Sequence, residues 1–184
     1  FAGMAWVGGG GAIGDFGNNT RDWALLEAFI KGSKPVVGIC YGSIAIAQAK
    51  DSLTGAYLLQ GHFATGHGDA DNYTENTATM NPDGTYNPSV SGAAPINLSD
   101  MLKQAIGPEE GGYVMELGRA PMAVMSGGAI ITGNTVEDGD STADLLLASR
   151  LGGLTGDYFI AGDGRGRVLT KDDPAVERVA RVIG

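Results

Sequence analysis

The chain has 184 residues, which is enough for one domain with a substantial core. Its formal net charge of -9 argues against nucleic acid or an anionic membrane as the partner, because both require basic surfaces. A single cysteine excludes an intramolecular disulfide, so we expect a reducing compartment and a cytoplasmic location. No apolar run reaches the roughly 20 residues that a membrane-spanning helix needs.

A glycine-rich stretch follows the first predicted strand. Met4–Val7 is apolar and indicates a buried strand, and Gly8–Gly14 comes directly after it. The spacing Gly-x-Gly-x-x-Gly at Gly9, Gly11 and Gly14 is found in dinucleotide-binding turns. Such turns also need a helix opening at the third glycine and an acidic residue at the tip of the next strand, and neither is indicated here. We therefore expect a loop whose backbone N–H groups approach a reacting centre.

The first long helix is predicted over Arg21–Ile30. An apolar stripe at helical spacing is formed by Trp23, Leu26, Phe29 and Ile30. Thr20 is a suitable N-cap, and the pair Lys31-Gly32 is typical of a helix end.

Cys40 lies between a predicted strand and a predicted helix. The run Pro35–Ile39 indicates a buried strand, and the small residues of Ile44–Ala49 indicate a helix. Gly38 and Gly42 flank the cysteine, which allows the strained turn of a nucleophile elbow. The dipoles of the helix N-terminus favour thiolate over thiol at this position. The alternative is an inert cysteine packed under the helix.

A polar stretch follows the next short strand, His62–Thr65. Residues Gly66–Asn76 are rich in hydrogen-bonding side chains, among them His67, Asp69 and Asp71. Loop-like composition continues to about Pro95. A run of this length inside a domain is often functional.

The remaining elements again alternate in type. We expect a helix over Ile96–Ile106, a hairpin or strand pair from Tyr113–Leu117 and Ala120–Met125, a strand over Ala129–Gly133, a helix over Thr142–Leu151, a strand over Tyr158–Ala161 and a helix over Pro174–Ile183.

This alternation indicates an α/β domain with a parallel sheet that is covered on both faces. Ligands bind such sheets at the carboxyl ends of the strands. Gly8–Gly14, Cys40 and His67–Asp71 each follow a predicted strand, so we expect them to meet at one edge of the sheet. No cofactor is indicated. A metal site is poorly supported, because His62 is the only further His or Cys near His67–Asp71.

Four stretches, in this order, resemble the DJ-1/PfpI superfamily, which is related to the class I glutamine amidotransferases. Met4–Gly11 is similar to the family's strand that ends in Pro-Gly-Gly, with Gly8 in place of the proline. Lys34–Ala47 is similar to the Lys-Pro-x-x-x-Ile-Cys-x-Gly elbow, and Leu58–His67 to the segment Leu-Leu-x-Gly-x-x-Ala-Thr-Thr-His. Ala129–Gly133 is similar to the family's last strand.

The resemblance covers about residues 1–152 and leaves 153–184 as a C-terminal extension that packs on or completes the domain. It implies a flavodoxin-like three-layer α/β sandwich with a nucleophile elbow. Cys40 is then the nucleophile, and backbone N–H groups near Gly9, Gly10 and Tyr41 hold the oxyanion.

The general base is not at the position where many relatives carry it. Many relatives carry His directly after the cysteine, where this chain has Tyr41, so His67 is the best remaining base. Asp69 or Asp71 could orient His67. His62 alternates to the other side of its strand, and we expect it to be structural.

The chain departs from the family at its start. Relatives begin with a further βα unit, whose strand ends in a Glu or Asp that hydrogen-bonds the cysteine, and Phe1–Val7 contains no such acid. The chain opens without Met, in what looks like the middle of a domain. We expect a truncated or processed chain, a partner segment that supplies the missing strands, or a substitute acid in the tail, Asp157 or Asp163. Relatives are often dimers, so a homo-oligomer is also expected.

Two classes of function follow. The first is a cysteine-dependent enzyme, a hydrolase, hydratase or glyoxalase/deglycase, acting on a small carbonyl, amide or nitrile-type substrate with Cys40 as nucleophile. The second is a non-catalytic family member with a chaperone-like, redox-sensing or ligand-binding role, which Tyr41 favours because it replaces a common histidine. A glutaminase would need a late histidine, and none follows His67.

Overall fold

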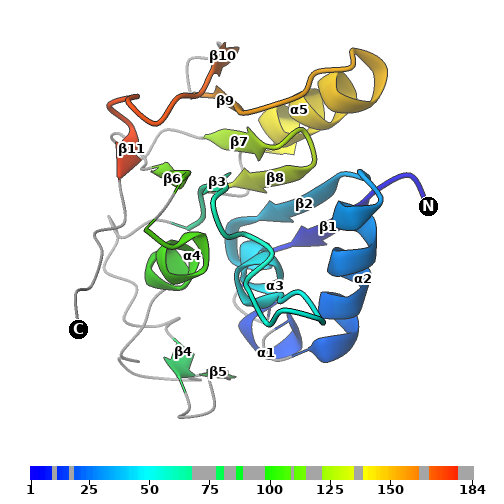
Figure 1. The fold of residues 1–184 in the computed structure, drawn as a ribbon, viewed down its shortest axis with the longest axis vertical. Helices are drawn as coiled ribbons and strands as arrows, with labels where there is room; N and C mark the ends of the chain where they lie inside the picture. The colour runs from blue at the N-terminus through cyan, green and yellow to red at the C-terminus, as the bar shows by residue number, and fades with distance from the viewer. Residues whose placement is uncertain are drawn as a thin grey trace.

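A six-stranded sheet forms the centre of the molecule (Figure 1). The computed structural model describes residues 1–9, 12–16, 19–67, 78–80, 86–88, 98–108, 110–114, 122–134, 139–161 and 166–177. From one edge to the other, the strands are β1 (Met4–Val7), β2 (Val36–Ile39), β8 (Ile130–Gly133), β7 (Ala123–Ser126), β9 (Tyr158–Ile160) and β10 (Gly166–Val168).

The sheet is parallel in one half and antiparallel in the other. β1, β2 and β8 run parallel, β7 runs antiparallel to β8 and β9, and β10 runs antiparallel to β9. Four of the six strands therefore point the same way. The predicted α/β class is confirmed, and the predicted parallel sheet is found in part, because β7 and β10 run against the other four strands.

Smaller sheets and helices surround this sheet. The second sheet contains β11 (Val176–Glu177), β6 (Gly112–Val114) and β3 (Phe63–Ala64), and a separate hairpin contains β4 (Ala78–Met80) and β5 (Tyr86–Pro88). The helices are α1 (Ala12–Phe16), α2 (Thr20–Lys31), α3 (Ser43–Gln48), α4 (Leu98–Ile106) and α5 (Gly139–Leu151), with a 3₁₀ turn, η1 (Cys40–Gly42), before α3.

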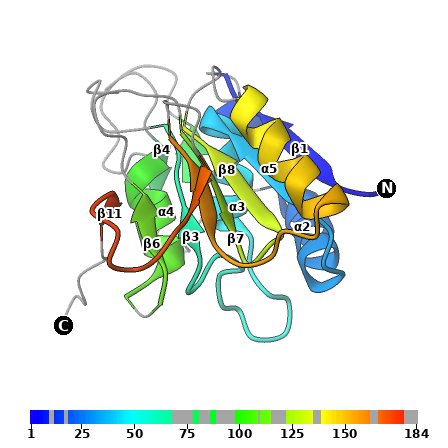
Figure 2. The ribbon, with the colours of Figure 1, turned by 90° about the horizontal axis from the view of Figure 1, so that it is seen from above.

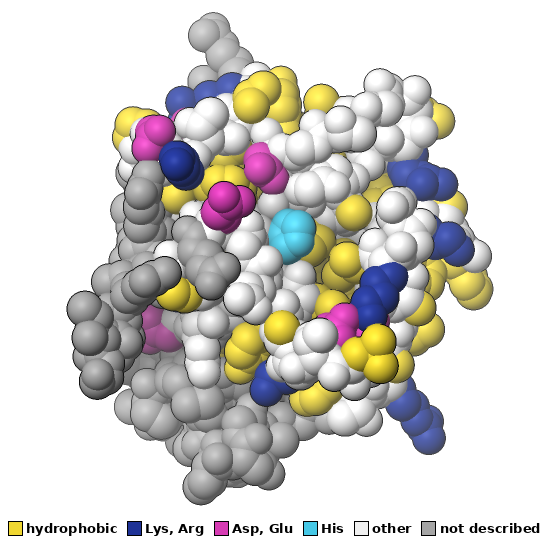
Figure 3. All heavy atoms as spheres, viewed as in Figure 1, with side chains coloured by type: hydrophobic (Ala, Val, Ile, Leu, Met, Phe, Trp, Pro, Cys, Tyr) yellow, Lys and Arg dark blue, Asp and Glu magenta, His cyan; other side chains and the backbone are white. Residues whose placement is uncertain are grey.

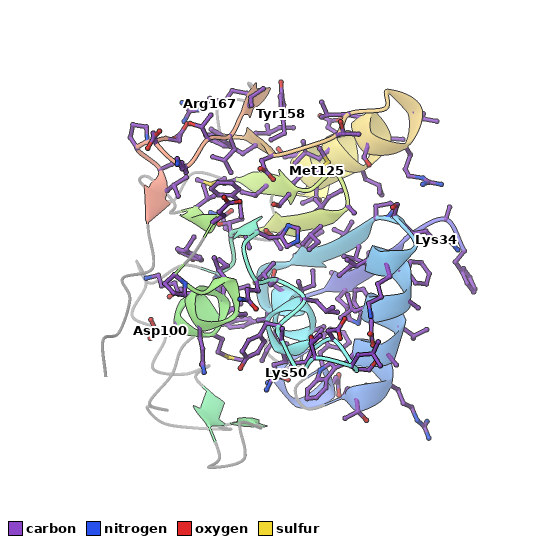
Figure 4. All side chains as sticks on the ribbon, viewed as in Figure 1. Lys34, Lys50, Asp100, Met125, Tyr158 and Arg167 are labelled. Atoms are coloured by element: carbon purple, nitrogen blue, oxygen red, sulfur yellow. The ribbon has the colours of Figure 1, made fainter. Side chains whose placement is uncertain are left out.

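Helices cover both faces of the sheet. Val36 packs in one hydrophobic cluster with Leu26 of α2 and Ile44 of α3. Val37, the next residue of β2, packs in another cluster with Leu145 of α5. Figure 2 shows α5 lying along the strands on one side, and the fully buried Met125 of β7 lies beside it (Figure 4). Successive side chains of a strand point to opposite faces, which explains the two clusters.

Helix α2 begins one residue earlier than predicted. Its N-cap is Asn19, whose Oδ1 accepts hydrogen bonds from the N–H groups of Arg21 (3.2 Å) and Asp22 (3.4 Å). Leu26 and Phe29 are buried, as the apolar stripe predicts. The predicted N-cap, Thr20, is instead the first helical residue.

A short helix replaces part of the predicted glycine loop. The N–H of Ala12 donates to the carbonyl oxygen of Gly9 (2.9 Å), which begins the turn into α1. Phe16 packs against the core and gives this helix an apolar contact. Local apolar packing therefore outweighs the poor helix propensity of glycine here.

Strand β7 pairs with β8, and the predicted pairing with the strand at Tyr113 is wrong. Gly127 and Gly128 both have positive φ (57° and 70°) and turn the chain between Ser126 and Ile130. This glycine pair permits a tight hairpin, which forces β7 to run antiparallel to β8. β6 lies in the second sheet, where it pairs with β3 and β11.

The tail contributes strands to both larger sheets. The strand predicted at Tyr158–Ala161 is confirmed as β9, which pairs with β7 and β10. The helix predicted from Pro174 is wrong over its described part, because Val176–Glu177 pairs with β6 as β11. The N–H of Leu169 also donates to the carbonyl oxygen of Asp157 (3.0 Å).

β1 lies at an edge of the central sheet. An apolar cavity of about 350 Å³ lies between this strand and α5, and the exposed Leu147 and Leu151 line it. The expected partner segment, or second copy of the chain, stays a prediction. Within the described parts of the chain, no helix combines the length and apolar character that crossing a bilayer requires.

Candidate functional site

Cys40 occupies a strained turn at the carboxyl end of β2. Its φ is +55°, and the only other non-glycine residue with positive φ in the described part of the chain is Ser33. It begins η1, which leads into α3, so the strand-to-helix turn predicted from the sequence is present. A left-handed conformation costs an L-residue about 1–2 kcal/mol, and such strain often marks functional sites.

Two flanking glycines make this turn possible by bringing backbones together. A Cβ on Gly42 would lie 2.0 Å from the carbonyl oxygen of Trp6, inside the backbone of β1. A Cβ on Gly38 would lie 2.9 Å from the Cα of Ser43. The hydroxyl of Ser43 donates to the carbonyl oxygen of Gly38 (3.1 Å) and fastens α3 to β2.

The end of β1 packs directly on the cysteine. A Cβ on Gly8 would lie 2.9 Å from the Cβ of Cys40 and 2.7 Å from the backbone nitrogen of Tyr41. The next residue, Gly9, has φ +121°, and no atom of the described residues lies within 4 Å of a Cβ built on it. Gly10, the third expected oxyanion residue, lies outside the described residues.

His67 lies beside the elbow, although β3 belongs to a different sheet from β2. The rings of His67 and Tyr41 meet edge to face, with centroids 4.7 Å apart and an interplanar angle of 76°. The N–H of Thr65 donates to Oγ1 of Thr132 (2.8 Å), which holds the end of β3 against β8. The structure thus brings His67 to the residue that follows Cys40. Asp69 and Asp71 lie outside the described residues.

Access to the thiol is narrow. Cys40 is 7% exposed and Tyr41 is 4% exposed. Both pack in the hydrophobic cluster of α2, α3 and α4. The thiol is therefore largely enclosed by this cluster.

Asp157 does not serve as the acid for Cys40. Its Oδ1 accepts hydrogen bonds from the hydroxyl of Ser126 (2.7 Å) and the N–H of Gly127 (3.0 Å). Ser126 ends β7 and Gly127 begins the turn to β8. Both lie at the end of the sheet opposite Cys40, because Val36 pairs with Ile130 at the start of β2 and β8. Asp163, the other acid considered, lies outside the described residues.

The part of the chain that the structure describes contains no cluster of three or more His, Cys, Asp or Glu residues that could hold a metal ion. The site therefore consists of a buried thiol on a strained turn, a neighbouring histidine and glycine backbone. Such a set can perform nucleophilic addition or reversible thiol oxidation.

The fold is an α/β architecture shared with solved structures. Rapid Encystment Protein 24 KDa (REP24) of Francisella tularensis superimposes with a TM-score of 0.62 and 20% identity, over 81% of this chain and 58% of that one. The protein APC35852 superimposes with a TM-score of 0.62 and 18% identity, over 81% of this chain and 59% of that one. This chain thus spans less than two thirds of the length of either protein. No family model and no curated protein matches the sequence.

Proposed function

We propose that the protein is a DJ-1/PfpI-like, cysteine-dependent enzyme with a flavodoxin-like three-layer sandwich and Cys40 as nucleophile. The observation that carries the proposal is the positive φ of Cys40 on a strand-to-helix turn flanked by Gly38 and Gly42. A merely structural cysteine has no need of a left-handed backbone. A nucleophile elbow uses that conformation to lift the reactive atom out of the sheet.

The substrate class is a small carbonyl, amide or nitrile-type compound. In the proposed step, Sγ of Cys40 adds to the electrophilic carbon, and the electron pair of the broken π bond moves to the oxygen or nitrogen. N–H groups of Gly9, Gly10 and Tyr41 stabilise that charge. His67 moves the proton, as its place beside Tyr41 supports.

The pH dependence of Cys40 alkylation by iodoacetamide tests the proposal. The chain contains one cysteine, so the label reports one site, and Cys40→Ser is the blank. We expect alkylation of the native protein with an apparent pKa well below the value of ~8.5 of a free thiol. Alkylation of Cys40 only in the unfolded chain would show that the thiol is inert in the native protein. That result would overturn the proposal.

A second candidate is reversible oxidation of Cys40 in a non-catalytic protein. Tyr41 stands where many relatives have a histidine, and the low exposure of Cys40 restricts entry to small oxidants. Sulfenic acid trapping with dimedone after peroxide treatment measures this reaction. Trapping without turnover of α-oxoaldehydes, amides or isonitriles would favour the redox function over the enzyme.

A further inference from the structure

A second polar cluster lies at the opposite end of the central sheet from Cys40. It joins His62, Ser126 and Asp157, which come from three distant parts of the chain. Nδ1 of His62 lies 3.1 Å from Oγ of Ser126, and that hydroxyl lies 2.7 Å from Oδ1 of Asp157. Val36 pairs with Ile130, four residues before Cys40, so the cluster and the thiol are separated by the length of β2, about 13 Å at 3.3 Å per residue.

The protons of this cluster can be assigned from its partners. Ser126 is 1% exposed, and its Oγ also accepts the N–H of Phe63 (3.0 Å). A hydroxyl has one proton, and the Asp157 carboxylate can only accept, so the Ser126 proton points to Asp157. His62 must then carry its proton on Nδ1 and donate it to Ser126. Nε2 of His62 is left as a lone-pair acceptor.

This arrangement fits a binding role better than a nucleophilic one. The hydroxyl of Ser126 donates once and accepts twice, which leaves it no capacity for attack. His62 is instead held in one tautomer by a Ser–Asp relay. These buried hydrogen bonds therefore fix the orientation of the His62 imidazole.

A cavity of about 390 Å³ adjoins the cluster, a size that suits a small organic ligand. His62 and Ser126 line it together with Arg150 of α5, Leu154 and Thr155. Arg150 is the only lining residue that is charged at every physiological pH, and no carboxylate of the described residues forms an ion pair with it. Figure 3 shows one histidine ring at the molecular surface, between acidic and apolar side chains.

We propose that this cavity, the His62 pocket, binds a small carboxylate that also carries a hydrogen-bond donor, such as a 2-hydroxy acid. The carboxylate pairs with the guanidinium of Arg150, and the hydroxyl of the ligand donates to Nε2 of His62. The charged groups nearest the imidazole are Asp157, which accepts from Ser126, and Arg150, which is exposed and lines the same cavity. Burial lowers the pKa of His62, and the Asp157 charge only partly opposes this, which keeps Nε2 an acceptor near pH 7.

Glycolate is the probe, with acetate and glycolamide as matched controls. Acetate lacks the hydroxyl donor and glycolamide lacks the charge. In ¹⁵N NMR titrations of the histidine rings, we expect the free protein to show a protonated Nδ1 and a bare Nε2 on His62. We expect glycolate to shift that Nε2 signal saturably, with a dissociation constant at least about tenfold below those of the controls.

Variants separate the pocket from the rest of the molecule. Arg150→Gln should weaken glycolate binding at least about tenfold. Arg167→Gln should not, because that guanidinium pairs with Asp173 on the surface of the tail (3.3 Å). Cys40→Ser should bind glycolate as the native chain does. This binding test is therefore independent of the proposed function of Cys40.

Three results would overturn the proposal. They are the absence of saturable binding at tens of millimolar glycolate, equal binding of glycolate and acetate, and a His62 ring protonated on Nε2 instead of Nδ1. The tautomer is read in the native chain, so the proposal remains testable if His62→Gln does not fold.

Discussion

At the scale of single residues, glycine and one strained cysteine determine the candidate site. Gly42 leaves room for the carbonyl of Trp6, and Gly8 leaves room for the side chain of Cys40. These contacts hold β1, β2 and η1 closer together than any side chain would allow. The positive φ of Cys40 thus occurs where glycines on both sides allow close backbone packing.

Gly42→Ala tests this close contact. The new Cβ would lie 2.0 Å from the backbone oxygen of Trp6, and a backbone cannot rotate away as a flexible side chain can. We expect the free energy of unfolding in urea to fall by at least about 2 kcal/mol.

Gly139→Ala is the matched control. Among the described residues, no heavy atom lies within 4 Å of its added Cβ, at the start of α5. We expect a change within about 0.5 kcal/mol. Equal losses in the two variants would mean that glycine replacement itself, and not the contact with Trp6, destabilises the chain.

At the scale of elements, α2 shows how local hydrogen bonds define a boundary. Asn19 and Thr20 are both residue types that favour the N-cap position. Only Asn19 accepts the N–H groups of Arg21 and Asp22. Its extended backbone (φ -84°, ψ 91°) orients the amide oxygen toward them.

Asn19→Ala should therefore destabilise the protein by about 1 kcal/mol, because two N–H groups of the first turn lose their acceptor. Thr20→Ala should change stability by less than about 0.5 kcal/mol, since Thr20 is an exposed helical residue. Urea midpoints monitored by circular dichroism measure both. The reverse order would make Thr20 the cap.

Ion pairs stabilise the C-terminal end of α2. The ammonium of Lys31 lies 2.7 Å from Oδ2 of Asp51 and also pairs with Glu27. This ammonium, together with the N–H groups of Thr54 and Leu53, holds the pKa of Asp51 well below its ordinary value. The stabilisation is therefore present above the unfolded pKa of about 3.9, and it is lost as the pH falls below that value.

Asp51→Asn should lower the urea midpoint at pH 7. The difference in urea midpoint between this variant and the native chain should shrink as the pH falls below about 4. The amide oxygen can still accept from Leu53 and Thr54, so the change removes mainly the charge. Asp144→Asn is the control, because Asp144 is exposed and forms no ion pair with described residues. A difference in urea midpoint that does not depend on pH would show that the Asp51 carboxylate does not stabilise the protein through its charge.

At the scale of the whole molecule, the sequence predicts strands that have a clear local pattern of residues. It does not predict which strands pair with one another in a sheet. Met4–Val7, Pro35–Ile39 and Ala129–Gly133 are apolar runs that form strands in any arrangement, so they are predictable. The partners of β7 were not predicted, because they depend on Gly127 and Gly128 having positive φ. β3 has only two residues, too few for a pattern that would indicate its separate sheet.

The two candidate sites also differ in how far the sequence predicts them. Cys40 could be found because its flanking glycines are adjacent in the sequence. The cluster of His62, Ser126 and Asp157 has no such signal, since 64 and 31 residues separate its successive members. His62 was expected to be structural, and only the fold shows its relay to Asp157.

The C-terminal tail contributes β9 and β10 to the central sheet. β9 adds Phe159 to a buried cluster with Val124 of β7. Phe159 is 1% exposed, and the guanidinium of Arg167 lies 4.2 Å from its ring centroid. We expect Phe159→Ala to cost about 3–5 kcal/mol, because it leaves a large cavity beside β7.

Tryptophan fluorescence shows whether that loss reaches the other half of the sheet. Both tryptophans, Trp6 and Trp23, lie in β1 and α2, far from Phe159 in the order of strands. If residues 1–177 unfold as one cooperative unit, Phe159→Ala moves the fluorescence and circular dichroism midpoints together. Val168→Ala, on the exposed side of β10, should move neither. A fluorescence midpoint that stays in place while the circular dichroism midpoint falls would make the tail a separate folding unit, because β1, β2 and their helices would then be stable without it.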